Sequence, residues 1–156
     1  MKKQEEPLIH PLIQITKKYL GAFADVTQHI PLERYHYVLV LILENNQTLT
    51  QKDLANYLLV DKSFMVNMID YLTKNGFVFR ETDKEDRRKH LIKLTQKAFD
   101  YIPEINKAIK EINDLALNGI SETQRIIFTE VLEKIEQNFN INITHTISFD
   151  YKKSEN

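Results

Sequence analysis

The segment 61–95 limits the fold of this chain more than any other part of its sequence. Asp61 is a favourable helix N-cap, and the apolar residues that follow at helical spacing end at Gly76, which suits the left-handed position after a helix. Two apolar runs, 77–79 and 91–94, then flank an almost unbroken run of charged and polar residues. This pattern predicts a helix followed at once by a β-hairpin with a highly charged tip.

A second, shorter helix is predicted just before this segment. Thr50 is a good N-cap, and Asp53 completes a capping-box pattern for a helix from Gln51 to about Leu58. Two helices joined by a tight turn and followed by a charged hairpin have the order of a winged helix-turn-helix. The fold class is therefore predicted to be mainly α, with a two-stranded wing.

Apolar residues at helical spacing predict four further helices around this segment. One covers 8–28, and another is expected to open at Pro31, because proline at the first helical position loses no hydrogen bond. After the hairpin, Thr95 should begin a long helix that Pro103 kinks, and the capping-box pattern at 121–124 should begin the last helix.

The C-terminal stretch 139–151 has a different pattern, because its apolar residues fall on alternate positions. A period of two predicts a strand or an extended arm. A partly ordered tail is the alternative, and the sequence leaves both open. The alternating residues are Phe139, Ile141, Ile143, Ile147, Phe149 and Tyr151.

Composition excludes several classes of site and compartment. The length of 156 residues favours one domain. The absence of cysteine excludes disulfides, zinc–thiolate sites and thiol redox sensing. No apolar run reaches the length of a membrane span, and the first ten residues lack the apolar core of a secretory signal, so we expect a cytoplasmic protein without membrane contacts.

Charge is distributed unevenly along the chain. The net charge is −1, but residues 50–97 contain ten Lys and Arg against seven Asp and Glu, a net charge of +3. The predicted helix-turn-helix and wing are thus mildly basic, and the flanks are acidic. This asymmetry is weak support for a nucleic-acid partner.

The segment 49–98 resembles the DNA-binding lobe of the MarR-type (multiple-antibiotic-resistance regulator) transcription factors. The first helix carries "LTQ.DLA..L", the second helix and its exit carry "VDKS…V..MID.L…G.V.R", and the wing and the restart of the helical part carry "D..DRR…I.LT". Together these motifs are quite specific, whereas a lone DRR would carry no information.

The resemblance implies one MarR-like domain over 1–156 and a homodimer that binds a palindromic operator in double-stranded DNA. It implies a winged-helix lobe at about 32–95, dimerisation helices at about 8–28 and 95–138, and an extended tail at 139–156. It also implies a cleft where small aromatic or anionic effectors weaken DNA binding. No cofactor is implied.

The charged tip of the predicted hairpin can be interpreted as a DNA-binding wing or as an ordinary solvent-exposed turn. In the first interpretation, Arg87 enters a narrow minor groove, Arg88 and Lys89 contact phosphates or pair internally, and Asp83 and Asp86 shape the tip by pairing with the arginines. In the second, the hairpin is a solvated turn whose charges neutralise each other. The helix-turn-helix directly upstream favours the first interpretation.

The second helix gives a mixed indication of base contacts. Asn67 suits adenine, and Phe64 or Val66 suits a thymine methyl, although Phe64 and Val66 packing inward is the alternative. Relatives commonly place Thr at those two positions and Arg at that of Asn67. The residues predicted to contact DNA are Thr50, Gln51, Lys62, Ser63, Phe64, Val66, Asn67, Tyr71, Lys84, Arg87, Arg88 and Lys89.

The sequence also contains candidate residues for an effector site and a metal site. The candidates for an effector cleft are Tyr19, Phe23, Tyr35, His36 and Tyr37, with plain core packing as the alternative. Some relatives bind metals where His29, Glu33 and His36 cluster here, but ordinary surface histidines are the favoured interpretation and no metal site is predicted.

The sequence therefore predicts a dimeric DNA-binding regulator, a repressor released by a small molecule. The alternative is a winged-helix module that binds another protein and not specific DNA. An enzyme is not expected, because no nucleophile–base pair, glycine-rich phosphate loop or paired-acid motif is visible.

Overall fold

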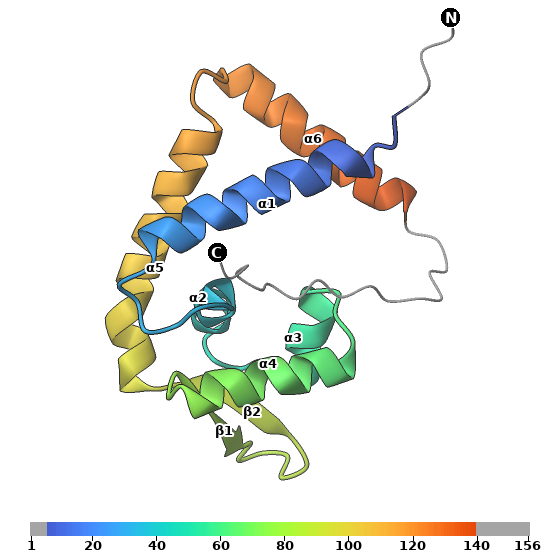
Figure 1. Cartoon of the computed structure of the whole chain (residues 1–156). Coiled ribbons are helices and arrows are strands. Elements are labelled where there is room, and N and C mark those ends of the chain that lie inside the picture. Colours follow the sequence, from blue (N-terminus) through green and yellow to red (C-terminus); the bar gives the residue numbers. More distant parts are fainter. Residues whose placement is uncertain (1–5, 140–156) are drawn as a thin grey trace, which may run out of the picture.

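The structure is a computed structural model that describes residues 6–139. In Figure 1, two long helices cross at the top, a third descends along one side, and a compact lobe with a hairpin lies at the bottom. The elements in chain order are α1 (Ile9–Val26), α2 (His36–Glu44), α3 (Gln51–Tyr57), α4 (Lys62–Lys74), β1 (Val78–Thr82), β2 (His90–Leu94), α5 (Gln96–Ala116) and α6 (Glu122–Asn138). This mainly helical fold with a two-stranded wing confirms the predicted fold class.

The core lies in the lobe, between α2, α3, α4, the hairpin and the first turns of α5. Six of the nine residues of α2 are buried, which explains why that helix is apolar nearly all round. The fully buried side chains include Leu39, Leu41, Ile42, Leu54, Met65, Ile69, Leu72, Phe77, Ile92 and Ile105.

The helix ends predicted from the sequence are present. The Thr50 side chain accepts a hydrogen bond from the Asp53 amide while the Asp53 carboxylate accepts one from the Thr50 amide, which is a full capping box. Gly76 has a φ of 76°, and the Phe77 amide donates to the Leu72 carbonyl at 3.0 Å, which closes the helix-ending motif of α4.

The hairpin is longer than the two apolar runs suggested. β1 and β2 pair antiparallel with Val78 opposite Leu94 and Thr82 opposite His90. The segment before α3 lies beside the hairpin, because the Ile92 amide donates to the Leu49 carbonyl at 2.9 Å. The wing is therefore attached directly to the start of the helix-turn-helix.

The prediction that Pro31 opens a helix is wrong, since α2 begins only at His36. Ile30 and Leu32 are both buried while residues 31 and 33 are exposed, and the Leu32 amide donates to the Ile30 carbonyl at 2.7 Å, which makes a tight turn around Pro31 instead of a first helical turn. Tyr35 then adopts a left-handed conformation, with a φ of 69°, immediately before α2. The burial of Ile30 and Leu32 in the core therefore decides the backbone path here, and Pro31 does not begin a helix.

The other flanking predictions have mixed outcomes. α5 continues through Pro103, which lies inside it. The last helix begins with the expected capping box between Ser121 and Gln124. The predicted tail at 139–156 lies outside the described residues except for Phe139, which follows α6.

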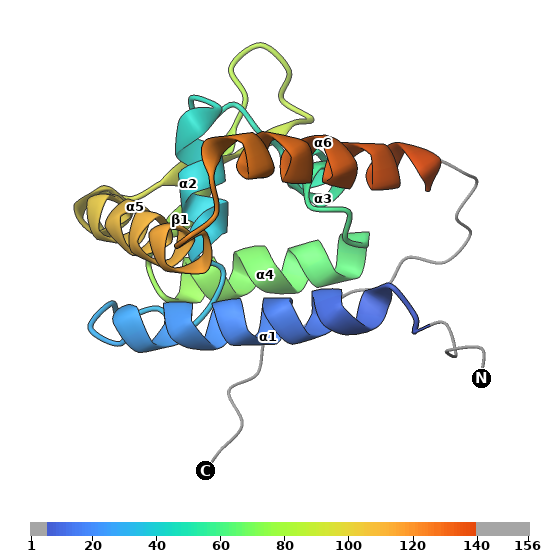
Figure 2. The ribbon, with the colours of Figure 1, turned by 90° about the horizontal axis from the view of Figure 1, so that it is seen from above.

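The terminal helices are only weakly covered. Neither α1 nor α6 has a buried residue. In Figure 2 the ribbons of the two helices run apart from each other, with α1 along one edge of the molecule and α6 across its middle. Within residues 6–139, no helix is both long and apolar enough to cross a bilayer. Large apolar side chains exposed on or next to these two helices are Leu8, Ile9, Ile15, Leu20, Ile126, Ile127, Phe128, Val131, Leu132 and Phe139.

Candidate nucleic-acid interface and apolar cavity

The outer face of α4 is polar and open. Ser63, Asn67 and Asp70 recur at helical spacing and are all exposed, as is Lys62 at the first position. Asp61 fixes the start of this helix, because its Oδ1 accepts a hydrogen bond from the Phe64 amide at 2.7 Å. Val66 is half-buried beside this face. Lys62, Ser63, Val66 and Asn67 thus lie on or beside the exposed face of α4.

Phe64 and Tyr71 do not lie on that outer face. Both rings pack edge-to-face on Tyr35, with centroid distances of 6.3 Å for Phe64 and 5.6 Å for Tyr71. They share a helical stripe with the buried Met68, and that stripe faces the core. The inward alternative for Phe64 therefore describes its position, and the outward position predicted for Tyr71 is wrong.

At the start of α3, Thr50 and Gln51 are both engaged within the chain. The Thr50 hydroxyl donates to the Asp53 carboxylate at 2.7 Å. Gln51 accepts through its Oε1 from Arg80 Nε at 2.7 Å, and Arg80 Nη2 also donates to Asp70 Oδ1 at 2.6 Å. The sequence alone gave no reason to single out Arg80, although it stands at the last position of the second motif.

Two aspartates build the tip of the wing. The Asp83 carboxylate accepts from the Glu85 and Asp86 amides at 2.7 and 3.1 Å. These backbone hydrogen bonds stabilise the charged form and lower the pKa of Asp83. Asp83 thus shapes the tip through the backbone, whereas the sequence predicts that it pairs with an arginine.

Asp86 does pair with an arginine. Its Oδ1 accepts from Arg88 Nε and from the Arg88 amide, both at 3.1 Å, and the Arg88 hydrogen bonds lower the pKa of the Asp86 carboxyl. Arg87 makes no hydrogen bond or ion pair within the described chain, and it is exposed, as are Lys84 and Lys89. Both arginines of the tip therefore face solvent, and they differ in that Arg88, with a side chain 92% exposed, is paired with Asp86.

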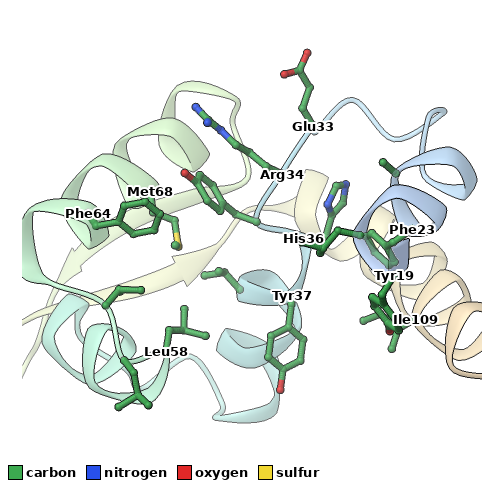
Figure 3. Close-up of a pocket in the computed structure, with 16 residues that line it drawn as sticks. Tyr19, Phe23, Glu33, Arg34, His36, Tyr37, Leu58, Phe64, Met68 and Ile109 are labelled. Carbon is green, nitrogen blue, oxygen red and sulfur yellow. The ribbon is translucent and has the colours of Figure 1, made fainter. Parts of the chain in front are cut away.

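An apolar cavity of about 510 Å³ lies between α1, α2, α4 and the turn before α4. Figure 3 shows its lining side chains converging from these elements. All five residues predicted for an effector cleft line this cavity: Tyr19, Phe23, Tyr35, His36 and Tyr37. Phe64 and Met68 of α4 also line it, so the cavity wall includes the helix whose other face is the candidate groove-reading surface.

Polar groups in the cavity wall are few and held by aromatic rings. The Arg34 guanidinium lies 5.2 Å from the ring centroid of Tyr35 and 4.7 Å from that of Tyr71. His36 is buried and contacts the Phe23 ring edge-on at 5.3 Å. Tyr37 is 49% exposed, and its pKa is raised by burial first and then by the neighbouring Tyr57 and Glu44.

The two histidines considered for a metal have other partners. His29 Nε2 lies 2.5 Å from Glu104 Oε2 on α5, whereas His36 packs in the cavity wall against Phe23. Among residues 6–139, no group of three or more His, Cys, Asp or Glu side chains is arranged to hold a metal ion.

A sequence model of the MarR family matches residues 32–90. The fold is similar to that of a MarR family transcriptional regulator from Listeria monocytogenes complexed with 26mer DNA, with a TM-score of 0.77 and 24% identity over 86% of this chain and 89% of that chain. It is also similar to the transcriptional regulator SlyA, with a TM-score of 0.77 and 23% identity over 85% and 94% of the two chains. CouR from Rhodococcus jostii RHA1, bound to p-coumaroyl-CoA, has a TM-score of 0.75 and 24% identity over 92% and 99%.

Proposed function

We propose that this chain is a winged-helix transcriptional regulator of the MarR family, whose sequence model matches residues 32–90, and that it is a homodimeric repressor that a small aromatic acid releases from DNA. The observation that carries the proposal is the pairing of an exposed polar face on α4 with a wing tip that presents Arg87. Helix α4 and the hairpin lie at the bottom of the lobe in Figure 1. The similar fold of the Listeria regulator, which is complexed with 26mer DNA, supports DNA as the partner.

In this proposal each lobe reads one half of a palindromic operator. Lys62, Ser63, Val66 and Asn67 enter the major groove, and Arg87 enters the adjacent minor groove, where its unpaired guanidinium meets concentrated negative potential. Lys84, Arg88 and Lys89 contact phosphates. Thr50 and Gln51 approach the backbone from α3, and Phe64 and Tyr71 support α4 from behind.

Two lobes must be held at the spacing of successive major grooves, roughly 34–36 Å. The exposed apolar side chains of α1 and α6 are suited to bury against a second copy, which supports the dimerisation role of about 8–28 and 95–138. The lobe at about 32–95 and these helices form one MarR-like domain over 1–156 in this proposal.

The cavity supports the effector part of the proposal. A ligand there would touch Phe64 and Met68, so its binding energy acts directly on α4. The apolar wall suits an aromatic ring, and the Arg34 guanidinium suits a carboxylate. Two proteins of similar fold support a small-molecule effector: CouR is bound to p-coumaroyl-CoA, and the DNA binding of Bordetella bronchiseptica BpsR is regulated by 6-hydroxynicotinic acid.

The DNA-binding part is tested by Arg87→Ala measured against Arg88→Ala. On a labelled operator from a genomic-fragment selection, Arg87→Ala should weaken binding to all sequences and lower the slope of log affinity against log salt by about one. Arg88→Ala should lower this salt slope less than Arg87→Ala does, because Asp86 already neutralises the Arg88 guanidinium. A salt-independent affinity would support the alternative of a protein partner.

The effector part is tested with salicylate. Millimolar salicylate should weaken operator binding, and Phe23→Ala and Tyr37→Ala should each abolish this response without changing DNA affinity in its absence. An unchanged dissociation constant across a panel of aromatic acids would refute the assignment of the cavity, as would a response that survives both substitutions.

A further inference from the structure

Arg80 joins the three parts of the candidate DNA-binding surface. It lies on β1 in the base of the wing, and its forked guanidinium reaches both helices of the helix-turn-helix. Nε donates to Gln51 on α3 at 2.7 Å, and Nη2 donates to Asp70 on α4 at 2.6 Å. A single side chain therefore fixes the wing, α3 and α4 relative to one another.

Asp70 occupies a position that is unfavourable for a protein that binds DNA. It is on the same exposed face of α4 as Ser63 and Asn67, and its side chain is 58% exposed. A carboxylate there would repel the phosphates beside the groove that this face is proposed to enter. The ion pair with Arg80 neutralises that charge within the lobe.

Gln51 is oriented by the same contact. An arginine side chain only donates hydrogen bonds, so the amide oxygen of Gln51 must face Arg80. The amide nitrogen of Gln51 is then turned away from Arg80, with both of its hydrogens available to an acceptor. A phosphate oxygen is the acceptor that DNA offers to such a donor.

We propose that Arg80 is a positioning residue for DNA binding, which masks the charge of Asp70 and presents the amide group of Gln51 to the phosphate backbone. The inference rests on the proposed DNA-binding function. It does not require Arg80 to touch DNA, and this distinguishes it from the roles assigned to Arg87, Arg88 and Lys89.

The test is a double-mutant cycle on a labelled duplex of about 30 base pairs, long enough for two half-sites one turn apart. Arg80→Met removes the guanidinium and keeps the apolar stem, and it should weaken binding about tenfold by exposing Asp70. Adding Asp70→Asn should recover most of that loss. Adding Glu81→Gln, which removes a neighbouring carboxylate paired with Lys93 at 3.7 Å, should recover little.

Melting temperatures report whether each variant is folded. If Arg80→Met does not fold, Arg80→Lys serves in its place, because a single ammonium group cannot replace both arms of the fork. Asp70→Asn alone should bind DNA at least as tightly as the wild type.

Two results of the cycle would overturn the inference. If Arg80→Met weakens binding equally in the wild-type background and in the Asp70→Asn background, Arg80 contacts phosphate directly. If Glu81→Gln restores binding as well as Asp70→Asn does, the effect is one of general charge. A wild-type protein that does not bind DNA would overturn the proposed function and this inference with it.

Discussion

The lobe and the terminal helices bury their apolar residues in different ways. In the lobe, α2 has six buried residues and α4 has four, all within one chain. In the terminal helices, α1 and α6 have none, although α6 carries apolar residues at 126–128, 131 and 132. The lobe is thus complete as a single copy, and the terminal helices are not.

This difference separates two contributions to stability. Side chains buried in the lobe contribute at any protein concentration, because their partners belong to the same chain. In the proposed dimer, side chains exposed on α6 would contribute only when a second copy covers them, so their contribution would rise with concentration. The same change, loss of one aromatic ring, should therefore have different consequences in the two regions.

The largest expected effect is in the lobe. Phe77→Ala removes a ring with no exposed surface that packs against Tyr101 at a centroid distance of 6.1 Å. The loss of contacts and the cavity left behind should lower the free energy of unfolding by about 3–5 kcal/mol, measured by urea denaturation. Phe79→Ala, two residues further and 43% exposed, is the matched control and should cost less than about 1 kcal/mol. Similar losses for both variants would contradict the expectation that burial in the lobe sets the cost.

The second largest expected effect is a loss of dimer stability when the terminal helix α6 is changed. Phe128→Glu places a charge on a side chain that is 53% exposed in the single chain and lies on the apolar face of α6. A two-fold interface contains the change twice, so losing two aromatic burials should weaken the dimer by about 3 kcal/mol or more. Light scattering should then fall from about twice 18.5 kDa toward 18.5 kDa at micromolar concentration.

Thr129→Glu adds the same charge to the neighbouring position and is the control for the α6 variant. It should leave the mass unchanged if Thr129 lies away from the interface. A wild type that scatters as a monomer at this concentration would contradict the assembly on which the comparison depends.

Local signals in the sequence were sufficient for most helix ends. Thr50 with Asp53, and Gly76 after α4, act on backbone groups within a few residues, so their patterns have the same meaning in any fold. Pro31 is also a local signal, but the burial of Ile30 and Leu32 in the core decided the path of the chain there.

The candidate site was less predictable because its contacts are non-local. Arg80 meets Gln51 from 29 positions away, and no spacing rule connects them. The sequence predicts that Tyr71 lies on the surface of its helix. In the fold, Tyr35 adopts a left-handed conformation, and its ring packs against Tyr71. The cavity residues were named from the resemblance to a family, and the fold is what brings Tyr19 of α1 and Tyr37 of α2 to the same cavity.

The smallest effect on stability is expected at the helix caps. The lobe and the terminal helices each contain a capping box, at α3 and at α6. At α3 the box is closed by the Asp53 carboxylate, which accepts from the Thr50 amide at 2.8 Å, whereas at α6 it is closed by the neutral amide of Gln124. The hydrogen bonds from the Thr50 side chain and backbone lower the pKa of Asp53 below its usual 3.8. Because the pKa is lower in the folded state, the cap stabilises the lobe above pH 3.8, and this contribution is lost as the pH falls through the folded pKa.

Asp53→Asn should therefore cost less than about 1 kcal/mol near neutral pH, since the carboxylate is largely exposed, and should make α3 insensitive to acid. The difference in urea midpoint between Asp53→Asn and the wild type should shrink as the pH is lowered toward about 3. Gln124→Glu is the matched change in α6, and it should introduce there the acid sensitivity that Asp53→Asn removes from α3. A wild-type-to-variant difference that stays constant with pH would mean that the Asp53 charge does not contribute to the cap.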